Sequence, residues 1–154
     1  MPREVLLVED SPGDVRLMQV ALQHANPAVH LNVVTDGAEA IAFLSHEGMY
    51  AKSPRPDVIL LDLNLPKVDG REVLAYIKQD PSLKSIPTVV LTTSADEADI
   101  NQSYELQANC YLAKPVEFVF FEALVKSIND FWLTRVKFPL TDAGSSARCH
   151  QAAR

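Results

Sequence analysis

Residues 58–70 of this 154-residue chain read VILLDLNLPKVDG. The run 58–61 has no polar residue, which is typical of a strand that is buried on both faces of a parallel sheet. The strand ends at Asp62, after which Pro66 and Gly70 keep the chain at the surface as a loop. An apolar strand that delivers a carboxylate to a surface loop predicts an α/β protein with its functional edge at the carboxyl ends of the strands.

Apolar runs alternate with helix-like segments along the rest of the chain. Further strands are predicted at 5–8, 31–34, 89–91 and 110–113, and helices at 12–25, 37–46, 70–79, 95–107 and 117–136. Four of these helices begin with a capping residue that a carboxylate follows three positions later, as in Ser11 and Asp14. The repeated β-then-α order predicts a doubly wound parallel sheet that is covered on both faces.

Size and composition favour one globular domain, which we place at residues 1–138, followed by a polar C-terminal tail at 139–154. The connection at 47–56 is longer than is usual in such folds, and it is either a contact loop or a tolerated insertion. No apolar run approaches the roughly 20 residues of a membrane helix. The net charge of −6 disfavours nucleic-acid and anionic-membrane surfaces. We therefore expect a cytoplasmic protein with protein and metal-ion partners, and with neither nucleic acid nor membrane.

Polar side chains stand where the predicted strands end. Glu9 and Asp10 follow the first strand, Asp62 the third, Thr92 closes the fourth and Lys114 follows the fifth. Three carboxylates on one patch would repel each other unless a cation such as Mg²⁺, which prefers oxygen ligands, relieves the repulsion. A carboxylate beside that ion can attack phosphorus, while a lysine and a hydroxyl group bind the phosphate oxygens.

Four segments resemble the signature segments of response-regulator receiver domains, in order and at the spacing of that family. They are Val8–Ser11, Leu61–Gly70, Leu91–Thr93 and Tyr111–Pro115, and the resemblance covers about residues 4–135. It implies a flavodoxin-like fold, in which a five-stranded parallel sheet has the strand order 2-1-3-4-5 and carries five helices.

The resemblance also implies roles for single residues. Asp62 would be the phosphoacceptor, and Mg²⁺ would be held by Asp10, Asp62 and the backbone carbonyl of Asn64, with Glu9 acting through water. Thr92 and Lys114 would contact the phosphoryl group. Tyr111 would change rotamer on activation together with Thr92, and the peptide bond between Lys114 and Pro115 would be cis.

Within the family, residues 8–17 and 91–94 resemble the small response regulators that partner cyanobacterial phytochromes. The implied protein is a single-domain response regulator rather than an enzyme with its own substrate. It would accept a phosphoryl group from a histidine kinase, with a phytochrome as the finer candidate, and signal through phosphorylation-dependent protein binding. Two alternatives stay open. A phosphatase would need a second aspartate at position 64, where this chain has Asn64, and an adaptor would be insensitive to phosphate.

The last predicted helix is apolar on two faces. One stripe would cover the sheet, and it comprises Phe121, Leu124, Val125, Ile128 and Trp132. Phe120 and Phe131 flank Leu124 on a second face, which predicts a partner. We expect a homodimer through the fourth and fifth helices and the fifth strand, with Phe120, Leu124 and Phe131 in the interface. The alternative is that residues 137–154 fold over this face.

Overall fold

The computed structural model describes residues 3–93 and 97–139, which form a five-stranded parallel sheet with the order β2-β1-β3-β4-β5. The strands are β1 (Glu4–Val8), β2 (His30–Val34), β3 (Val58–Leu61), β4 (Thr88–Thr92) and β5 (Cys110–Ala113). The helices are α1 (Pro12–Ala25), α2 (Gly37–Ser45), α3 (Gly70–Gln79), α4 (Glu97–Glu105) and α5 (Phe118–Trp132), with a short 3-10 helix, η1, at Gly48–Tyr50. Both the α/β fold class and the strand order are therefore confirmed.

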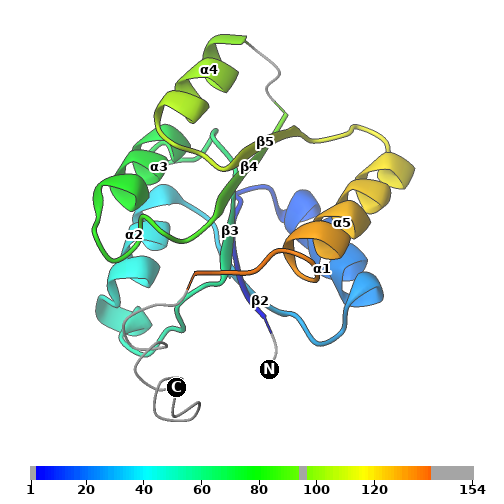
Figure 1. Cartoon of the computed structure of the whole chain (residues 1–154), viewed down its shortest axis with the longest axis horizontal. Helices are drawn as coiled ribbons and strands as arrows, with labels where there is room; N and C mark the ends of the chain where they lie inside the picture. The colour runs from blue at the N-terminus through cyan, green and yellow to red at the C-terminus, as the bar shows by residue number, and fades with distance from the viewer. Residues whose placement is uncertain (1–2, 94–96, 140–154) are drawn as a thin grey trace.

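The helices form two layers, one on each face of the sheet (Figure 1). On one face α1 and α5 lie together, and their buried residues, such as Met18 and Val125, pack on the odd-numbered side chains of β1. On the other face α2 and α3 cover the alternate side chains of β1, with Phe43 and Leu74 among the buried residues. Because successive side chains of a strand point to opposite faces, the unbroken apolar runs of β1 and β3 supply both cores at once.

The predicted last helix was too long, because α5 ends at Trp132 rather than near residue 136. Leu133 is buried and caps the helix, and the backbone N–H groups of Arg135 and Val136 both donate to the carbonyl of Phe131. The chain therefore turns away from the helix axis at this point. The predicted start of the fourth helix at residue 95 lies outside the described residues, and so does the residue before it that would cap the helix.

Beyond α5 the chain crosses the end of the sheet at which the strands begin (Figure 1). The ring of Phe138 lies 4.7 Å from the guanidinium carbon of Arg3, which precedes β1. Phe138 and Pro139 also line a cavity with Arg55 and Pro87, which precede β3 and β4. Residues 138–139 thus lie at the amino ends of the strands, and the predicted tail from 140 onward lies outside the described residues.

The long connection between α2 and β3 packs onto α2. The hydroxyl of Tyr50 donates to Oε1 of Glu39 at 2.8 Å, and the Tyr50 ring lies 5.4 Å from that of Phe43. Ser53 Oγ donates to the carbonyl of Phe43 at 2.8 Å. Met49, at the tip, is 87% exposed. No helix in the described parts of the chain has both the length and the apolar character to cross a bilayer.

Candidate functional site

The backbone ladder of the sheet continues one residue past each of three strands and so fixes the residues that follow them. The N–H of Glu9 donates to the carbonyl of Val34, and that of Asp62 donates to Val8. At the far side of the sheet the N–H of Lys114 donates to the carbonyl of Thr92 at 2.7 Å. Because the strands are parallel, these hydrogen bonds bring their carboxyl-end side chains to one edge, as the sequence predicts.

Gly70 allows α3 to begin directly against the loop that follows Asp62. A Cβ atom at this position would lie 2.3 Å from the carbonyl oxygen of Asp62 and 2.5 Å from the Cα of Leu63. The N–H of Gly70 donates to the carbonyl of Leu63 at 2.9 Å, which closes the loop. A residue with a side chain would therefore displace the backbone of Asp62 itself.

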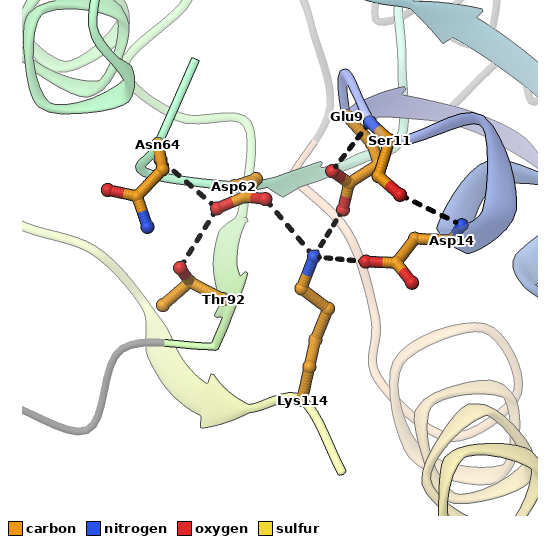
Figure 2. Close-up of polar contacts among 7 residues, drawn as sticks. All are labelled: Glu9, Ser11, Asp14, Asp62, Asn64, Thr92 and Lys114. Atoms are coloured by element: carbon orange, nitrogen blue, oxygen red, sulfur yellow. Dashed lines mark hydrogen bonds and ion pairs between the residues drawn. The ribbon is translucent and has the colours of Figure 1, made fainter. Parts of the chain in front are cut away.

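The carboxylate of Asp62 accepts hydrogen bonds at both of its oxygens (Figure 2). Oδ1 accepts from the hydroxyl of Thr92 at 2.9 Å and from the backbone N–H of Asn64 at 3.1 Å, and Oδ2 accepts from Lys114 Nζ at 3.1 Å. Burial alone would raise the pKa of Asp62, but the Asn64 N–H and the Lys114 charge outweigh burial and lower that pKa. Asp62 is therefore ionised at neutral pH.

Lys114 is the centre of the polar cluster. Its side chain is 4% exposed, and Nζ donates to Glu9 Oε1 at 2.5 Å and to Asp14 Oδ2 at 2.8 Å as well as to Asp62 (Figure 2). Burial would lower the pKa of Lys114, but the hydrogen bonds to Asp14 and Glu9 outweigh it and raise the pKa. The ammonium group is thus a permanent positive charge beside Asp62.

Asp14 is a member of this cluster that the sequence reasoning assigned to helix capping alone. The predicted capping box is only half formed: the N–H of Asp14 donates to Ser11 Oγ at 3.3 Å, but the N–H of Ser11 donates to Glu9 Oε2 at 3.2 Å. The Asp14 carboxylate therefore binds Lys114 instead. Asp14 lies in the first turn of the helix that follows β1, four residues beyond Asp10. This position near the carboxyl end of β1 could have indicated that Asp14 belongs to the polar cluster.

The site carries more negative than positive charge. Glu9, Asp10 and Asp62 each offer a carboxylate oxygen, and these oxygens lie within 4.8 Å of one another. Burial is the main cause that raises the pKa of Glu9 to about 7, against the lowering effect of its hydrogen bond to Lys114. A divalent cation would relieve this repulsion, and three hard oxygen donors suit Mg²⁺. The residues present therefore fit the predicted metal.

The remaining predicted residues take different positions. Asn64 is exposed and offers its N–H to Asp62, while its carbonyl as a metal ligand stays a prediction. Tyr111 is half-buried and packs on the core beneath α2 and α3, and its change of rotamer also stays a prediction. Phe120 and Phe131 are 60% and 55% exposed, as expected for residues that do not cover the sheet, whereas Leu124 is half-buried.

The cis peptide bond predicted between Lys114 and Pro115 was wrong, because the described residues contain no cis peptide bond. The trans isomer is favoured by about 0.5–1 kcal/mol in a bond that precedes proline. In this structure the contacts of Lys114 are made with the trans bond.

Residues 5–128 match the profile of the response regulator receiver domain. The chain belongs to this family. As a receiver, it is 53% identical over 138 residues to the response regulator Rcp1 of Synechocystis sp., and the match covers 90% of this chain and 94% of Rcp1.

Two solved structures resemble this receiver closely. The phosphorylated cyanobacterial phytochrome response regulator RcpA superposes with a TM-score of 0.88 at 50% identity, and the Mn²⁺-bound form of Rcp1 with a TM-score of 0.86 at 53% identity. Each match covers 90% of this chain and 99% of the other. The receiver is therefore a signalling domain of the two-component type, with relatives linked to phytochromes.

Proposed function

We propose that this receiver is a cytoplasmic single-domain response regulator that accepts a phosphoryl group on Asp62 from the phosphohistidine of a sensor kinase. Its output is binding to another protein. The observation that carries the proposal is the environment of Asp62. An ionised, buried carboxylate has a hydroxyl donor on one oxygen and an ammonium donor on the other, inside a cluster of oxygen ligands.

In the proposed reaction an oxygen of Asp62 attacks the phosphorus atom of phosphohistidine. The O–P bond forms as the P–N bond breaks, and the imidazole leaves with the electron pair of that bond. Thr92 and Lys114 hydrogen-bond Asp62 before the reaction, and we infer that they would donate to oxygens of the transferred group. Asp10, Asp62 and the carbonyl of Asn64 would hold Mg²⁺, with Glu9 acting through water. When bound, this ion neutralises charge on the attacking and transferred oxygens.

A phosphatase is the competing function, since such enzymes also use an aspartate nucleophile and a metal. It would need an acid or base two residues after the nucleophile. The residue there is Asn64, whose backbone N–H is directed at Asp62 and whose amide side chain does not titrate. Without that group the aspartyl phosphate lasts longer, which suits a switch better than a hydrolase.

Mass spectrometry of the intact protein tests the proposal. Incubation with Mg²⁺ and acetyl phosphate should add one phosphoryl group that is stable in acid and labile in base. Asp62→Asn should abolish the adduct. Asp57→Asn is the matched control, because Asp57 lies at the other end of β3 and binds the N–H of Glu4. The absence of an adduct in the wild type, or its persistence in Asp62→Asn, would sink the assignment.

The finer proposal is that the sensor kinase is a phytochrome. It is supported by the 50% identity to RcpA, which is a cyanobacterial phytochrome response regulator. A phosphorylated phytochrome kinase should transfer its phosphoryl group to this receiver faster than an unrelated histidine kinase at equal concentration. Equal transfer rates from the two kinases would contradict this choice of partner.

Phosphorylation should rearrange the segment from Thr92 through α4 to Tyr111. A dianionic group on Asp62 would take over the hydroxyl of Thr92, which now donates to the carboxylate, and so favour a second packing of this surface. Hydrogen exchange across residues 92–112 should therefore change when a phosphate mimic is added. Unchanged exchange in that segment would refute the rearrangement.

We also propose a homodimer through α4, β5 and α5. Phe120 and Phe131 expose large apolar rings on either side of Leu124, and β5 is an edge strand of the sheet. Phe138, in the segment proposed as an alternative cover, packs beside Arg3 instead. Such exposed aromatic groups favour a protein interface.

Sedimentation tests the dimer. The wild type should sediment as a dimer at tens of micromolar (roughly the range of a specific but modest interface), and Phe120→Ser with Phe131→Ser should shift it to the monomer. Met49→Ser is the matched control, since Met49 is even more exposed but lies on η1. A wild-type monomer with and without a phosphate mimic would contradict the dimer.

A further inference from the structure

The carboxylate of Asp14 lies in the acidic site without belonging to its group of metal-ligand candidates. It stands on the first turn of α1, it is 32% exposed, and Oδ2 accepts from Lys114 Nζ at 2.8 Å (Figure 2). The group of carboxylates close enough to share a metal comprises Glu9, Asp10 and Asp62. Asp14 therefore needs an explanation of its own.

Helix capping does not explain the side chain. The cap of α1 is made by Ser11 Oγ, which accepts from the backbone N–H of Asp14, so any residue at position 14 could use it. The N–H of Ser11, which a capping box would offer to Asp14, is bound to Glu9 instead. Among the described residues, Lys114 is the one polar partner of the Asp14 carboxylate.

Because of the geometry of an ammonium group, the contact between Asp14 and Lys114 affects the hydrogen bond from Lys114 to Asp62. Nζ carries three N–H donors, and three carboxylates accept from it: Glu9, Asp14 and Asp62. When two of the donors are held by Glu9 and Asp14, the third is directed at Asp62. Losing one holder frees the ammonium to rotate and its side chain to shift.

The three carboxylates that accept from Lys114 have different roles in the proposed phosphoryl transfer. Glu9 and Asp62 are also candidates for the metal, and Asp62 is the nucleophile that accepts the phosphoryl group in the proposed reaction. Asp14 has neither role, so it can keep its hydrogen bond to Lys114 throughout the reaction. We propose that Asp14 is a positioning residue that keeps one N–H of Lys114 directed at Asp62 and at the phosphoryl group that Asp62 receives. This inference rests on the proposed function for its effect on rate.

Two substitutions separate the hydrogen bond of Asp14 from its charge. Asp14→Asn and Asp14→Ala both remove the negative charge, but asparagine keeps an oxygen acceptor at the same reach. Any general loss of Mg²⁺ affinity through charge should be equal in the two variants. The difference between them isolates the contact with Lys114. Asp14→Leu, which keeps the approximate size of the side chain without an acceptor, should behave like alanine and guards against an effect of a cavity or of altered folding.

The rate of adduct formation from acetyl phosphate at saturating Mg²⁺ is the first measurement. Asp14→Ala and Asp14→Leu should be slower than the wild type by about tenfold, the usual cost of a hydrogen bond to a charged group, and Asp14→Asn by about threefold or less. Equal rates for alanine and asparagine, or a wild-type rate in alanine, would overturn the proposal.

The NMR signal of the Lys114 ammonium group is the second measurement and needs no phosphoryl transfer. A buried ammonium held by three carboxylates should give an observable NH₃⁺ signal in the wild type and in Asp14→Asn, and the signal should be lost by exchange in Asp14→Ala. Persistence of the signal in Asp14→Ala would overturn the positioning role even if the protein takes up phosphate. If the wild type forms no phosphoryl adduct but the Lys114 signals behave as expected, the proposed function is rejected and the contact between Asp14 and Lys114 still stands.

Discussion

Lys78 and Lys114 each hold an ammonium group against three oxygen atoms, but with opposite electrostatic results. Lys78, at the end of α3, donates to the carbonyls of Lys84 and Ile86 and to Oδ1 of Asn109, at 3.0–3.1 Å. Burial lowers the pKa of Lys78. The acceptors of Lys114 are carboxylates, and its pKa is raised. The charge of the acceptors, and not their number, therefore separates the contact of Lys78 from that of Lys114 in the proposed reactive site.

The two lysines also differ in what their acceptors can do. Those of Lys78 are neutral groups fixed by the fold, and Asn109 Oδ1 also accepts from the N–H of Thr88 at 2.8 Å. This contact ties the end of α3 to the start of β4. Of the carboxylates around Lys114, Glu9 and Asp62 belong to the group that could share a metal, and Asp62 is the proposed phosphoacceptor. The fixed neutral acceptors around Lys78 stabilise the fold, whereas the ionised carboxylates around Lys114 could exchange this lysine for another cation.

The largest predicted difference between the two lysines is the effect of removing the ammonium group on the rate of phosphorylation. Lys114→Met should slow adduct formation from acetyl phosphate by about 100-fold or more, because a preorganised donor to the transferred group is lost. Lys78→Met should leave the rate within about twofold, since its contacts lie at the other end of β4. A comparable loss of rate in both variants would erase the distinction between the two lysines.

Magnesium should stabilise the protein through the carboxylates and leave the surroundings of Lys78 unaffected. At a concentration about 100 times its Kd, Mg²⁺ should raise the free energy of unfolding by about 2.7 kcal/mol. Asp10→Asn should lose most of this gain, because Asp10 is one of the three clustered carboxylates. Lys78→Met should keep it. Urea denaturation with and without MgCl₂ measures all three proteins, and an equal gain in Asp10→Asn would reject the metal site.

The contact of Lys78 should matter for stability alone. Lys78→Met leaves three oxygen acceptors without their shared donor and should lower the free energy of unfolding by about 1–3 kcal/mol. Lys84→Met is the matched control, because Lys84 is exposed and contributes only its backbone carbonyl to this contact. The control should stay within about 0.5 kcal/mol of the wild type. Similar losses in both variants would mean that the ammonium contact adds little.

The smallest predicted effect is the change with pH in the stability that Lys78 contributes. The pKa of Lys78 lies below that of a lysine in the unfolded chain, about 10.4, so the unfolded state binds more protons between the two values. The stability that Lys78 contributes therefore rises with pH in that window. Urea denaturation from about pH 8 to 10 should show the gap between wild type and Lys78→Met widening, by less than about 1 kcal/mol because the group is only partly buried. A narrowing gap would mean that the oxygen contacts outweigh burial.

Local rules were enough to predict most of the fold. The apolar runs at 58–61 and 110–113 match β3 and β5 in full, and the helix predicted at 12–25 has the observed bounds of α1. Continuous apolar runs and capping residues act within a few residues of chain, which is why they can be read from sequence. The end of α5 was mislocated because Leu133 is buried in the core that α1 and α5 share with the sheet, and no local pattern indicates such burial.

The amino-acid sequence by itself determined the order of strands and helices and the types of side chain at the carboxyl edge of the sheet. Asp62, Thr92 and Lys114 could be chosen because polar residues that end apolar strands stand out along the chain. The tertiary structure decided which groups share one proton donor. Asp14 joined the cluster through its contact with Lys114, a residue 100 positions away in the sequence. Periodicity and capping describe neighbours in sequence, so they carry no information on such contacts.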